Sequence, residues 1–452
     1  MTAVPDPLAP PDNLPAEVLD RMLHALAARR TSGLIHLFLG WPEAAPPPDA
    51  ARLARAARLL VDAEPVLACR LLPEGRDGLR WHRHPDVDAI PWFEAIEAED
   101  RDAAIRAVIG QEEPADGRNL ILRLARLGTG GWLLALSVNH GVADGTAAYD
   151  CAYRLAALHD ALAADADHRP APNLASRDSY EWMANFSARH WLRVLRRDLG
   201  ELRQAGARPL GLEGPTDIAG WMAAPRGAPA HAAVTLDPAR LAALDRLAVA
   251  RGASRLELLV AALGRSFHTI LGADGTACFR VILPSNLRRY GGASRQPAIR
   301  NMSGMAAMTF TVDPAAPFAA TLAAATAEGA RLKRGLAGAT NPLAIGLMRR
   351  LGQRRLDAML EGVVARGLRR PSPPTFTNVG RIAEPRLRFG GVLPQDAMLL
   401  TMAFPRPLLL ITGTEFRRSL TLAIGYQADA WSAARMQPLL DGMVAELDGA
   451  LA

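Results

Sequence analysis

Apolar runs and helical patterns alternate in the first part of the chain. Residues 35–40 form a short apolar run typical of a buried strand, and residues 51–63 have the apolar spacing of an amphipathic helix. Two more runs, at residues 119–127 and 131–138, flank the turn sequence GTGG at 128–131 and predict a β-hairpin. These segments predict the sheet and the first helix of an α/β unit.

A second set of elements follows a polar, proline-containing segment at residues 165–179, which predicts a linker. A periodic helix is expected over residues 179–204, and a Gly/Pro-rich crossing over 211–229. Further strands are expected at 231–236, 277–283, 305–312, 408–412 and 420–426, with helices at 237–251 and 255–271.

Because helices and strands occur on both sides of the linker, we expect an α/β (α+β) protein with two lobes. The expected division is an N-terminal lobe over residues 1–170, a linker with a crossing helix over 171–229, and a C-terminal lobe over 230–452.

The sequence HGVADG at residues 140–145 lies where a predicted strand, 132–139, gives way to a predicted helix, 146–162. A histidine at such a turn is held by backbone on both sides, and Asp144 can fix the loop while the His140 imidazole points into a cleft, as a general base requires. A purely structural interpretation stays open, with His140 as a satisfied core histidine and Asp144 as the N-cap of the helix.

Four motifs in one order resemble those of the condensation-domain and chloramphenicol-acetyltransferase-like acyltransferases, which include peptide condensation domains, polyketide-associated acyltransferases and alcohol acyltransferases. VNHGVADG at 138–145 resembles their active-site motif, and EPVLACR at 64–70 resembles their early helix-to-strand region. VILPSNLR at 281–288 resembles a strand that ends in NLR, and FTNVGR at 376–381 resembles a later SNxGR motif. The resemblance spans about residues 35–427.

This resemblance implies that each lobe has a chloramphenicol-acetyltransferase-like fold, a mixed sheet with helices, and that a tunnel between the lobes reaches His140 from opposite faces. It implies that Asp144 is structural and pairs with an arginine, for which Arg288 is the expected partner and Arg289 the competing one. Asn139 departs from the pattern, because peptide-forming domains usually carry a second histidine there; the chain is more similar to the stand-alone acyltransferases.

Three asparagines are candidate substrate-binding residues: Asn378 in the FTNVGR motif, Asn301 and Asn139. Asn378 could equally be a structural residue of its loop. The backbone N–H of Gly145 can point at an oxyanion from the start of the helix, or the glycine can serve only a tight turn.

Acyl transfer needs a base and an oxyanion donor, and His140 suits the first role because its ordinary pKa lies near neutrality. The chain has no Gly-x-Ser-x-Gly sequence, and Ser303 is more typical of a turn than of a nucleophile, so we expect direct transfer without a covalent intermediate. His82 and His84 lack a carboxylate or cysteine at ligand spacing, so no metal site is expected.

Composition and charge limit the classes of partner that the protein is expected to bind. The 452 residues carry a net charge of +6 with 5% aromatic residues, and no aromatic-interleaved basic patch predicts a nucleic-acid partner. No apolar run is long enough to span a membrane, the N-terminus lacks a signal-peptide pattern, and the three cysteines are widely spaced, so a cytoplasmic location is expected. Seven arginines between Arg349 and Arg370, on one predicted helix, form a solvated face or contact a carrier protein or an anionic membrane surface.

The leading hypothesis is therefore an acyltransferase that moves an acyl group from a thioester to a hydroxyl or amine of a small-molecule acceptor, in natural-product or lipid-conjugate biosynthesis. No bound cofactor is expected; acyl-coenzyme A or an acyl-phosphopantetheine on a carrier protein is the expected co-substrate. Two alternatives remain: a condensation-like enzyme that cyclises or otherwise condenses a carrier-bound intermediate, and a non-catalytic scaffold that binds a carrier protein.

Overall fold

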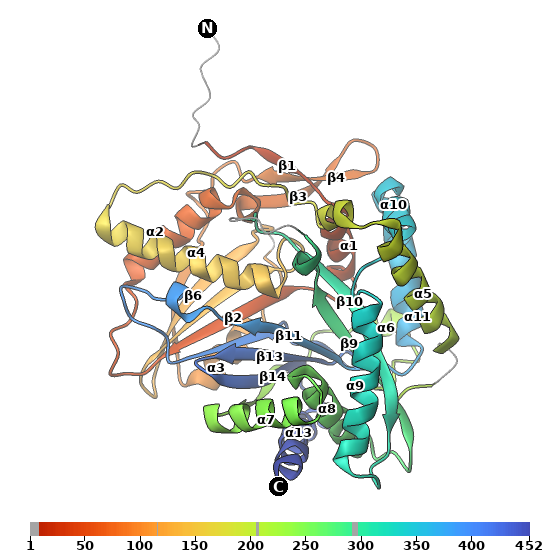
Figure 1. The fold of residues 1–452 in the computed structure, drawn as a ribbon. Helices are drawn as coiled ribbons and strands as arrows, with labels where there is room; N and C mark the ends of the chain where they lie inside the picture. The colour runs from red at the N-terminus through yellow and green to blue at the C-terminus, as the bar shows by residue number, and fades with distance from the viewer. Residues whose placement is uncertain (1–8, 115, 205–207, 292–296) are drawn as a thin grey trace.

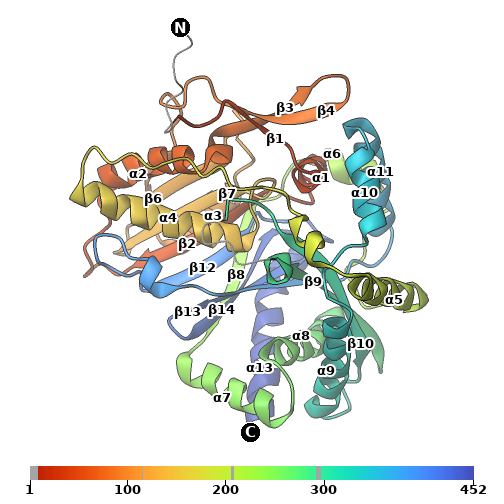
Figure 2. The same cartoon turned by 45° about the horizontal axis from the view of Figure 1, so that its top comes forward.

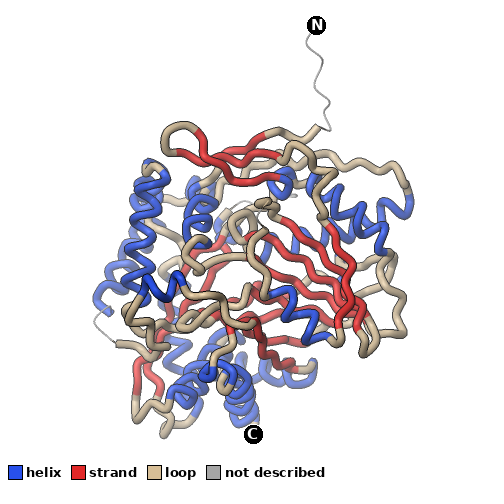
Figure 3. Tube along the Cα trace, turned by 180° about the vertical axis from the view of Figure 1, so that it is seen from behind, coloured by secondary structure: helices blue, strands red, loops and turns tan. Residues whose placement is uncertain are grey.

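Two mixed sheets, each covered by helices, form the centre of the molecule (Figures 1 and 3). This computed structural model describes residues 9–114, 116–204, 208–291 and 297–452. The five-stranded sheet has the order β12-β2-β7-β6-β5, and the six-stranded sheet has the order β10-β9-β11-β13-β14-β8. A small three-stranded sheet, β1-β4-β3, lies beyond the first lobe's helices (Figure 2).

The first lobe holds the five-stranded sheet, the small sheet and three helices. Its strands are β1 (Asn13–Pro15), β2 (Leu34–Trp41), β3 (Cys69–Glu74), β4 (Gly78–Arg83), β5 (Phe93–Ala98), β6 (Leu120–Leu127), β7 (Trp132–Asn139) and β12 (Asp396–Thr401). Its helices are α2 (Ala50–Ala63), α3 (Arg101–Ile109) and α4 (Gly145–Ala164).

The second lobe holds the six-stranded sheet. Its strands are β8 (Pro229–Leu236), β9 (Ala277–Asn286), β10 (Ser303–Val312), β11 (Thr375–Arg381), β13 (Leu410–Phe416) and β14 (Ser419–Gln427). Its helices are α7 (Pro238–Ala250), α8 (Arg255–Leu271), α9 (Phe318–Arg334), α12 (Ala430–Ala433) and α13 (Met436–Leu451).

A third group of helices lies beside the two sheets. It comprises α1 (Val18–Ala27), α5 (Ala188–Gln204), α6 (Ile218–Ala223), α10 (Pro342–Arg350) and α11 (Gln353–Leu368). Trp182, which is fully buried, belongs to the same apolar cluster as residues of α1, α5, α10 and α11. These helices therefore join the N-terminus of the chain to its second half.

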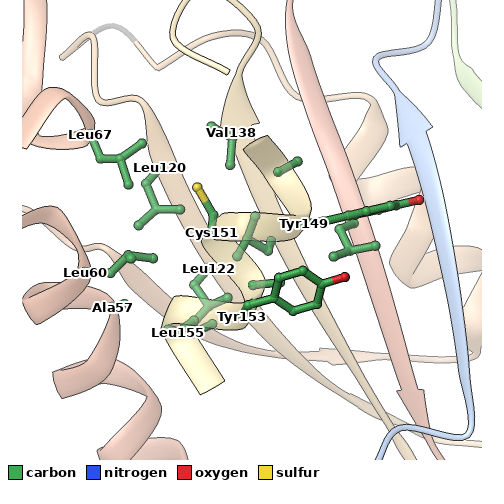
Figure 4. Close-up of a cluster of buried hydrophobic side chains, with 14 of the residues drawn as sticks. Ala57, Leu60, Leu67, Leu120, Leu122, Val138, Tyr149, Cys151, Tyr153 and Leu155 are labelled. Atoms are coloured by element: carbon green, nitrogen blue, oxygen red, sulfur yellow. The ribbon is translucent and has the colours of Figure 1, made fainter. Parts of the chain in front are cut away.

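The core of the first lobe explains why its strands are apolar runs. Every residue of β2 is buried, because the sheet is covered on both faces. On one face, α2 and α4 pack their apolar sides against β6 and β7, as Leu60, Cys151 and Leu122 show (Figure 4). Full burial of one such leucine contributes about 1.5–3 kcal/mol. The core therefore fixes the start of α4, and with it the end of β7.

Most elements expected from the apolar patterns are present, and the two-lobed α/β fold is confirmed. One expected boundary needs a correction. Residues 230–452 do not all belong to the second lobe, because β12 pairs antiparallel with β2 of the first lobe, with Leu399 opposite Leu37. The segment fuses the lobes: on β13, the Thr412 hydroxyl donates to the Leu399 carbonyl at 2.6 Å, and the Thr414 hydroxyl accepts from the Leu399 N–H at 2.9 Å.

Two expected helices are also wrong in extent. The periodic segment 179–204 is broken: a 3-10 helix over Glu181–Asn185 precedes α5, because the chain turns to bury Trp182. The arginine-rich segment 349–370 is divided between α10 and α11, since Gly352 is the N-cap of α11.

Candidate functional site

The His140 turn connects β7 to α4. The backbone N–H of His140 donates to the Gly33 carbonyl at 2.9 Å, which ties the turn to the chain that enters β2. The ring atom Nδ1 lies 2.8 Å from the Ala143 carbonyl oxygen. A carbonyl can only accept, so this contact places the proton on Nδ1. Both described polar contacts of the ring involve Nδ1, and Nε2 remains the unprotonated atom that the ring presents to the space around it.

Asp144 holds the turn through both carboxylate oxygens. Oδ1 accepts from the Ala147 N–H at 2.9 Å and caps α4. Oδ2 accepts from Arg288 Nη1 at 2.6 Å and from the Met302 N–H at 2.7 Å. The sequence left open whether Asp144 caps the helix or pairs with Arg288, and the structure shows both contacts. Because Arg288 and Met302 belong to the second lobe, this one carboxylate ties the lobes together.

The charge state of Asp144 follows from these contacts. Burial raises the pKa of the carboxyl group, but the Arg288 guanidinium and the N–H donors outweigh it, and the net pKa is lowered. Asp144 is therefore ionised at neutral pH, and it is a structural anion instead of a proton acceptor. Arg289, the competing partner, donates to the Ala337 carbonyl.

Asn301 reaches the same turn from the second lobe. Its Oδ1 accepts from the Ser303 N–H at 3.0 Å, which orients the amide so that Nδ2 faces His140. Nδ2 lies 3.2 Å from the His140 carbonyl oxygen, to which it donates, and 3.1 Å from Nδ1. Asn301 thus fixes the backbone of His140, and it also lines the same cavity as His140, as expected from the sequence.

The protonation of His140 depends mainly on its enclosure. Burial lowers the pKa of the imidazole below its ordinary value of 6.5, while the Ala143 carbonyl and the Asp144 carboxylate act in the opposite direction. The ring is therefore neutral at pH 7, with Nε2 able to accept a proton. This is the state that a general base needs.

A cavity of about 340 Å³ contains His140. First-lobe and α1 residues that line it are Leu19, Met22, Leu23, Leu26, Thr31, Ser32, Ile35, His140 and Gly145. The second half of the chain contributes Pro284, Asn301, Ser303, Met305, Ser372, Pro373, Thr375, Thr377, Val379, Leu399, Thr401, Phe404 and residues 408–410. His140 therefore lies between the two lobes, and no Asp, Glu, Lys or Arg is among these residues.

Asn378 is not among the described residues that line this cavity. Successive side chains of a strand point to opposite faces, and Thr377 and Val379 of β11 are the ones that face the cavity. The Asn378 Oδ1 instead accepts from the Gly380 N–H at 2.9 Å, where β11 shifts its register, and its side chain lies over Gly413. Of the two sequence interpretations of Asn378, these contacts fit the structural one, and its neighbours Thr377 and Val379 line the cavity instead.

Asn139 is likewise absent from the described lining. Its Oδ1 accepts from the Gly141 N–H at 2.7 Å, and its backbone carbonyl accepts from Val142 and Ala143. These bonds shape the turn that carries His140. The described contacts of Asn139 are therefore structural, and its role as a substrate-binding residue stays a prediction.

Gly145 lines the cavity at the start of α4. A Cβ at this position would lie 2.6 Å from Val379 Cγ2, so a larger residue would force Val379 to shift. The N–H of Gly145 is at the first helical position, where no intrahelical acceptor exists. Both sequence interpretations of this glycine, tight packing and a free N–H, are compatible with this geometry.

The sequence patterns did not single out most of the apolar lining. Leu19, Met22, Leu23 and Leu26 of α1 follow the i, i+3, i+4, i+7 spacing of one helix face, which is the signal that could have found them. Nothing local in the sequence places that face over His140, since the contact joins segments more than a hundred residues apart.

Within the described residues, no group of three or more His, Cys, Asp or Glu is arranged to hold a metal ion. Over the same parts of the chain, none of the helices combines the length and the apolar character that crossing a bilayer requires.

No sequence-family profile and no curated protein sequence matches this chain. Solved structures do. The first condensation domain of the calcium-dependent antibiotic synthetase, in complex with a substrate analogue, is 20% identical with a TM-score of 0.67, over 97% of both chains. Polyketide synthase associated protein 5 from Mycobacterium tuberculosis is 17% identical with a TM-score of 0.62, over 96% of this chain and 98% of that one.

A third similar structure is the cyclization-docking bidomain of a nonribosomal peptide synthetase from Sorangium cellulosum, 16% identical with a TM-score of 0.61, over 99% of this chain and 87% of that one. The chain thus has the condensation-domain fold, with two chloramphenicol-acetyltransferase-like lobes.

Proposed function

We propose that this protein is an acyltransferase that moves an acyl group from a thioester to a hydroxyl or amine, with His140 as the general base. The observation that carries the proposal is the setting of His140: its Nδ1 lies 2.8 Å from the Ala143 carbonyl oxygen, burial lowers the pKa of its ring, and the residue lines a cavity between the two lobes. A single imidazole between two lobes is open to two substrates while a thioester is kept from water.

In the proposed reaction, Nε2 of His140 takes the proton of the acceptor as its oxygen or nitrogen attacks the thioester carbonyl. The new bond forms while the carbonyl π electrons move to oxygen, giving a tetrahedral oxyanion. Collapse of this intermediate re-forms the carbonyl and breaks the C–S bond. The leaving thiolate takes the proton back from the imidazolium, so that ester or amide and free thiol are the products.

The N–H of Gly145 is the proposed donor to the oxyanion. It lines the same cavity as His140, it begins a helix of 20 residues, and no acceptor for it is described. A donor placed where negative charge develops stabilises the transition state more than the ground state. Asp144, Arg288 and Asn301 have positioning roles in this scheme, because their hydrogen bonds hold the His140 turn against the second lobe.

The cavity lining suggests the class of acyl group. Apart from Asn301 and His140, its side chains are aliphatic or aromatic or carry small hydroxyl groups, and none of those described carries a formal charge at neutral pH. An acyl chain bearing an ammonium or carboxylate would lose its hydration without an ion partner. We therefore infer an uncharged, apolar acyl group, delivered by coenzyme A or by the phosphopantetheine of a carrier protein.

Condensation of a carrier-bound intermediate fits about as well. The similar structures are described as a condensation domain, a polyketide synthase associated protein and a cyclization-docking bidomain, and each extends over nearly all of this chain. In that case the nucleophile that His140 deprotonates belongs to a second carrier-bound group, or to the acyl chain itself.

The experiment compares donors and products. Purified protein is mixed with octanoyl-coenzyme A or with octanoyl-phosphopantetheine on a carrier protein, in the presence of an alcohol or amine, and free thiol and acylated product are measured together. Thiol release matched by product, and absent in His140→Ala, supports acyl transfer. A cyclic or carrier-bound product supports the alternative, and no turnover with any donor contradicts both.

A further inference from the structure

Helix α5 presents apolar side chains to solvent. Leu192, Leu195 and Leu199 are 46%, 45% and 48% exposed. Their spacing of three and four residues places them on one side of the helix. Exposed leucines are common singly, but three in one stripe need a separate explanation.

The opposite side of α5 is firmly attached to the protein. Val194 is buried in the cluster around Trp182, and Arg197 donates to the Leu336 carbonyl at 2.9 Å and to the Ala339 carbonyl at 2.7 Å. These contacts fix the rotation of the helix about its axis. The leucine stripe therefore points outward because the inner face is already occupied.

Three exposed arginines follow the leucine stripe along α5: Arg189, Arg193 and Arg196. None of them forms an ion pair with a described residue. The acidic side chains of α5, Asp198 and Glu201, are engaged with Arg197. The outer side of α5 is thus cationic as well as apolar.

Helix α10, whose Ile345 and Met348 belong to the same buried cluster as Val194, adds two exposed residues, Leu343 at 81% and Leu347 at 58%. Helices α1 and α11 of the same group lie beside α10 (Figures 1 and 2).

We propose that the outer face of α5, defined by Leu192, Leu195, Leu199, Arg189, Arg193 and Arg196, docks on the surface of an anionic lipid bilayer. An amphipathic helix with leucines on one side and arginines beside them buries the leucines at the headgroup boundary while the guanidinium groups contact the phosphates. Charge complementarity selects an anionic bilayer over a neutral one. The site is separate from the catalytic cavity, and it does not rest on the proposed function.

The test uses vesicles of phosphatidylcholine alone and vesicles with equal parts of phosphatidylglycerol. The full chain should sediment with the anionic vesicles and not with the neutral ones, and added salt should weaken the binding. The variant Arg193→Glu/Arg196→Glu should bind at least about 25-fold more weakly, from about 1 kcal/mol for each arginine. Leu192→Ser/Leu195→Ser should also weaken binding, but without changing its salt dependence.

Helix α7 and its C-cap supply matched controls: Arg246 and Val249 of the helix and the C-cap residue Arg251 are exposed, and the described residues give the two arginines no ion pair. Arg246→Glu/Arg251→Glu and Val249→Ser should bind as the wild type does. Equal binding by the α5 and α7 charge variants overturns the proposal, as does failure of the wild type to bind anionic vesicles. If light scattering instead shows a dimer that the α5 leucine variant dissociates, the face is a self-association surface and the proposal is wrong.

Two readouts keep this proposal apart from the acyltransferase assignment. The α5 variants should keep wild-type turnover of a soluble thioester and an unchanged thermal melt, since none of these residues lines the cavity. His140→Ala should keep its vesicle binding. Loss of turnover in the first case, or of vesicle binding in the second, would show that the two sites are not separate.

Discussion

The His140 turn and strand β11 both border the cavity, but they do so by different means. The turn holds its polar side chains through hydrogen bonds from both lobes, with Asp144 alone accepting from Ala147, Met302 and Arg288. Strand β11 contributes through the alternation of its side chains, so that Thr377 and Val379 face the cavity.

The difference shows which kind of site a local sequence can reveal. In the turn, the residues that matter are close together and their roles follow from a strand end and a helix start. On β11, the role of each residue depends on which face of the sheet its side chain points to, and a short motif does not show this. If this contrast is right, variants of the turn should affect catalysis strongly, and variants of β11 should act only through packing.

The largest effect is expected for His140→Ala. Loss of a general base should lower kcat by about 10²–10⁴-fold, because no other described histidine lines the cavity. The measurement is thiol release with a soluble acyl thioester, with the thermal melt as the folding control. Near-normal turnover by this variant would end the assignment of His140 as the base.

Asp144→Ala should affect both rate and stability. It removes the partner of Arg288 and the cap of α4, and breaking a buried pair typically costs about 3–5 kcal/mol of the free energy of unfolding. Denaturant unfolding is the measurement. Arg289→Ala is the matched control, since its described contacts are to Tyr290 and the Ala337 carbonyl and it should behave as the wild type in turnover. Equal stability of Asp144→Ala and wild type would show that the pair does not hold the turn.

Gly145→Ala tests the contact between the two regions directly. The new Cβ meets Val379 Cγ2, and overpacking of this kind costs about 1–3 kcal/mol. The variant Gly145→Ala/Val379→Ala should regain stability and turnover, because alanine keeps the backbone N–H proposed to bind the oxyanion. A double variant that regains stability but not turnover would show that the clash with Val379 is not the reason why turnover needs Gly145.

The two asparagines of the second lobe form a matched pair. Asn301→Ala should lower kcat by up to about tenfold, the equivalent of one hydrogen bond of about 0.5–1.5 kcal/mol, because Asn301 fixes the His140 backbone. Asn378→Ala should leave kcat within about twofold, because its side chain bonds Gly380 and faces away from the cavity. The reverse order of effects would mean that Asn378, and not its neighbours on β11, faces the cavity.

Much of the fold could be predicted from apolar periodicity, because long runs such as 132–139 form strands in almost any packing. The pairing of Asp144 with Arg288 followed from a resemblance of ordered motifs. The pairing of β12 with the first lobe's sheet could not be predicted, because the apolar sequence of a buried strand does not show which sheet it joins. The break before α5 was missed because Trp182 fits a helical period as well as a buried turn.

The proposed base also has a defined dependence on pH. Burial lowers the pKa of His140 below 6.5, so the unprotonated ring persists at pH values where an exposed histidine would be charged. As pH falls through the lowered pKa, the ring gains a proton and can no longer accept one from the acceptor. Activity should therefore be lost on the acid side only, at a pH below the ordinary histidine value.

The pH profile of kcat/KM with a soluble acyl thioester tests the central claim most directly, because it reports the ionisation of the free enzyme. The account predicts a fall in kcat/KM at low pH with an apparent pKa below 6.5, and no such limb in the residual activity of His140→Ala. An apparent pKa at or above 6.5, or the same acid limb in His140→Ala, would contradict a neutral, enclosed His140 as the general base.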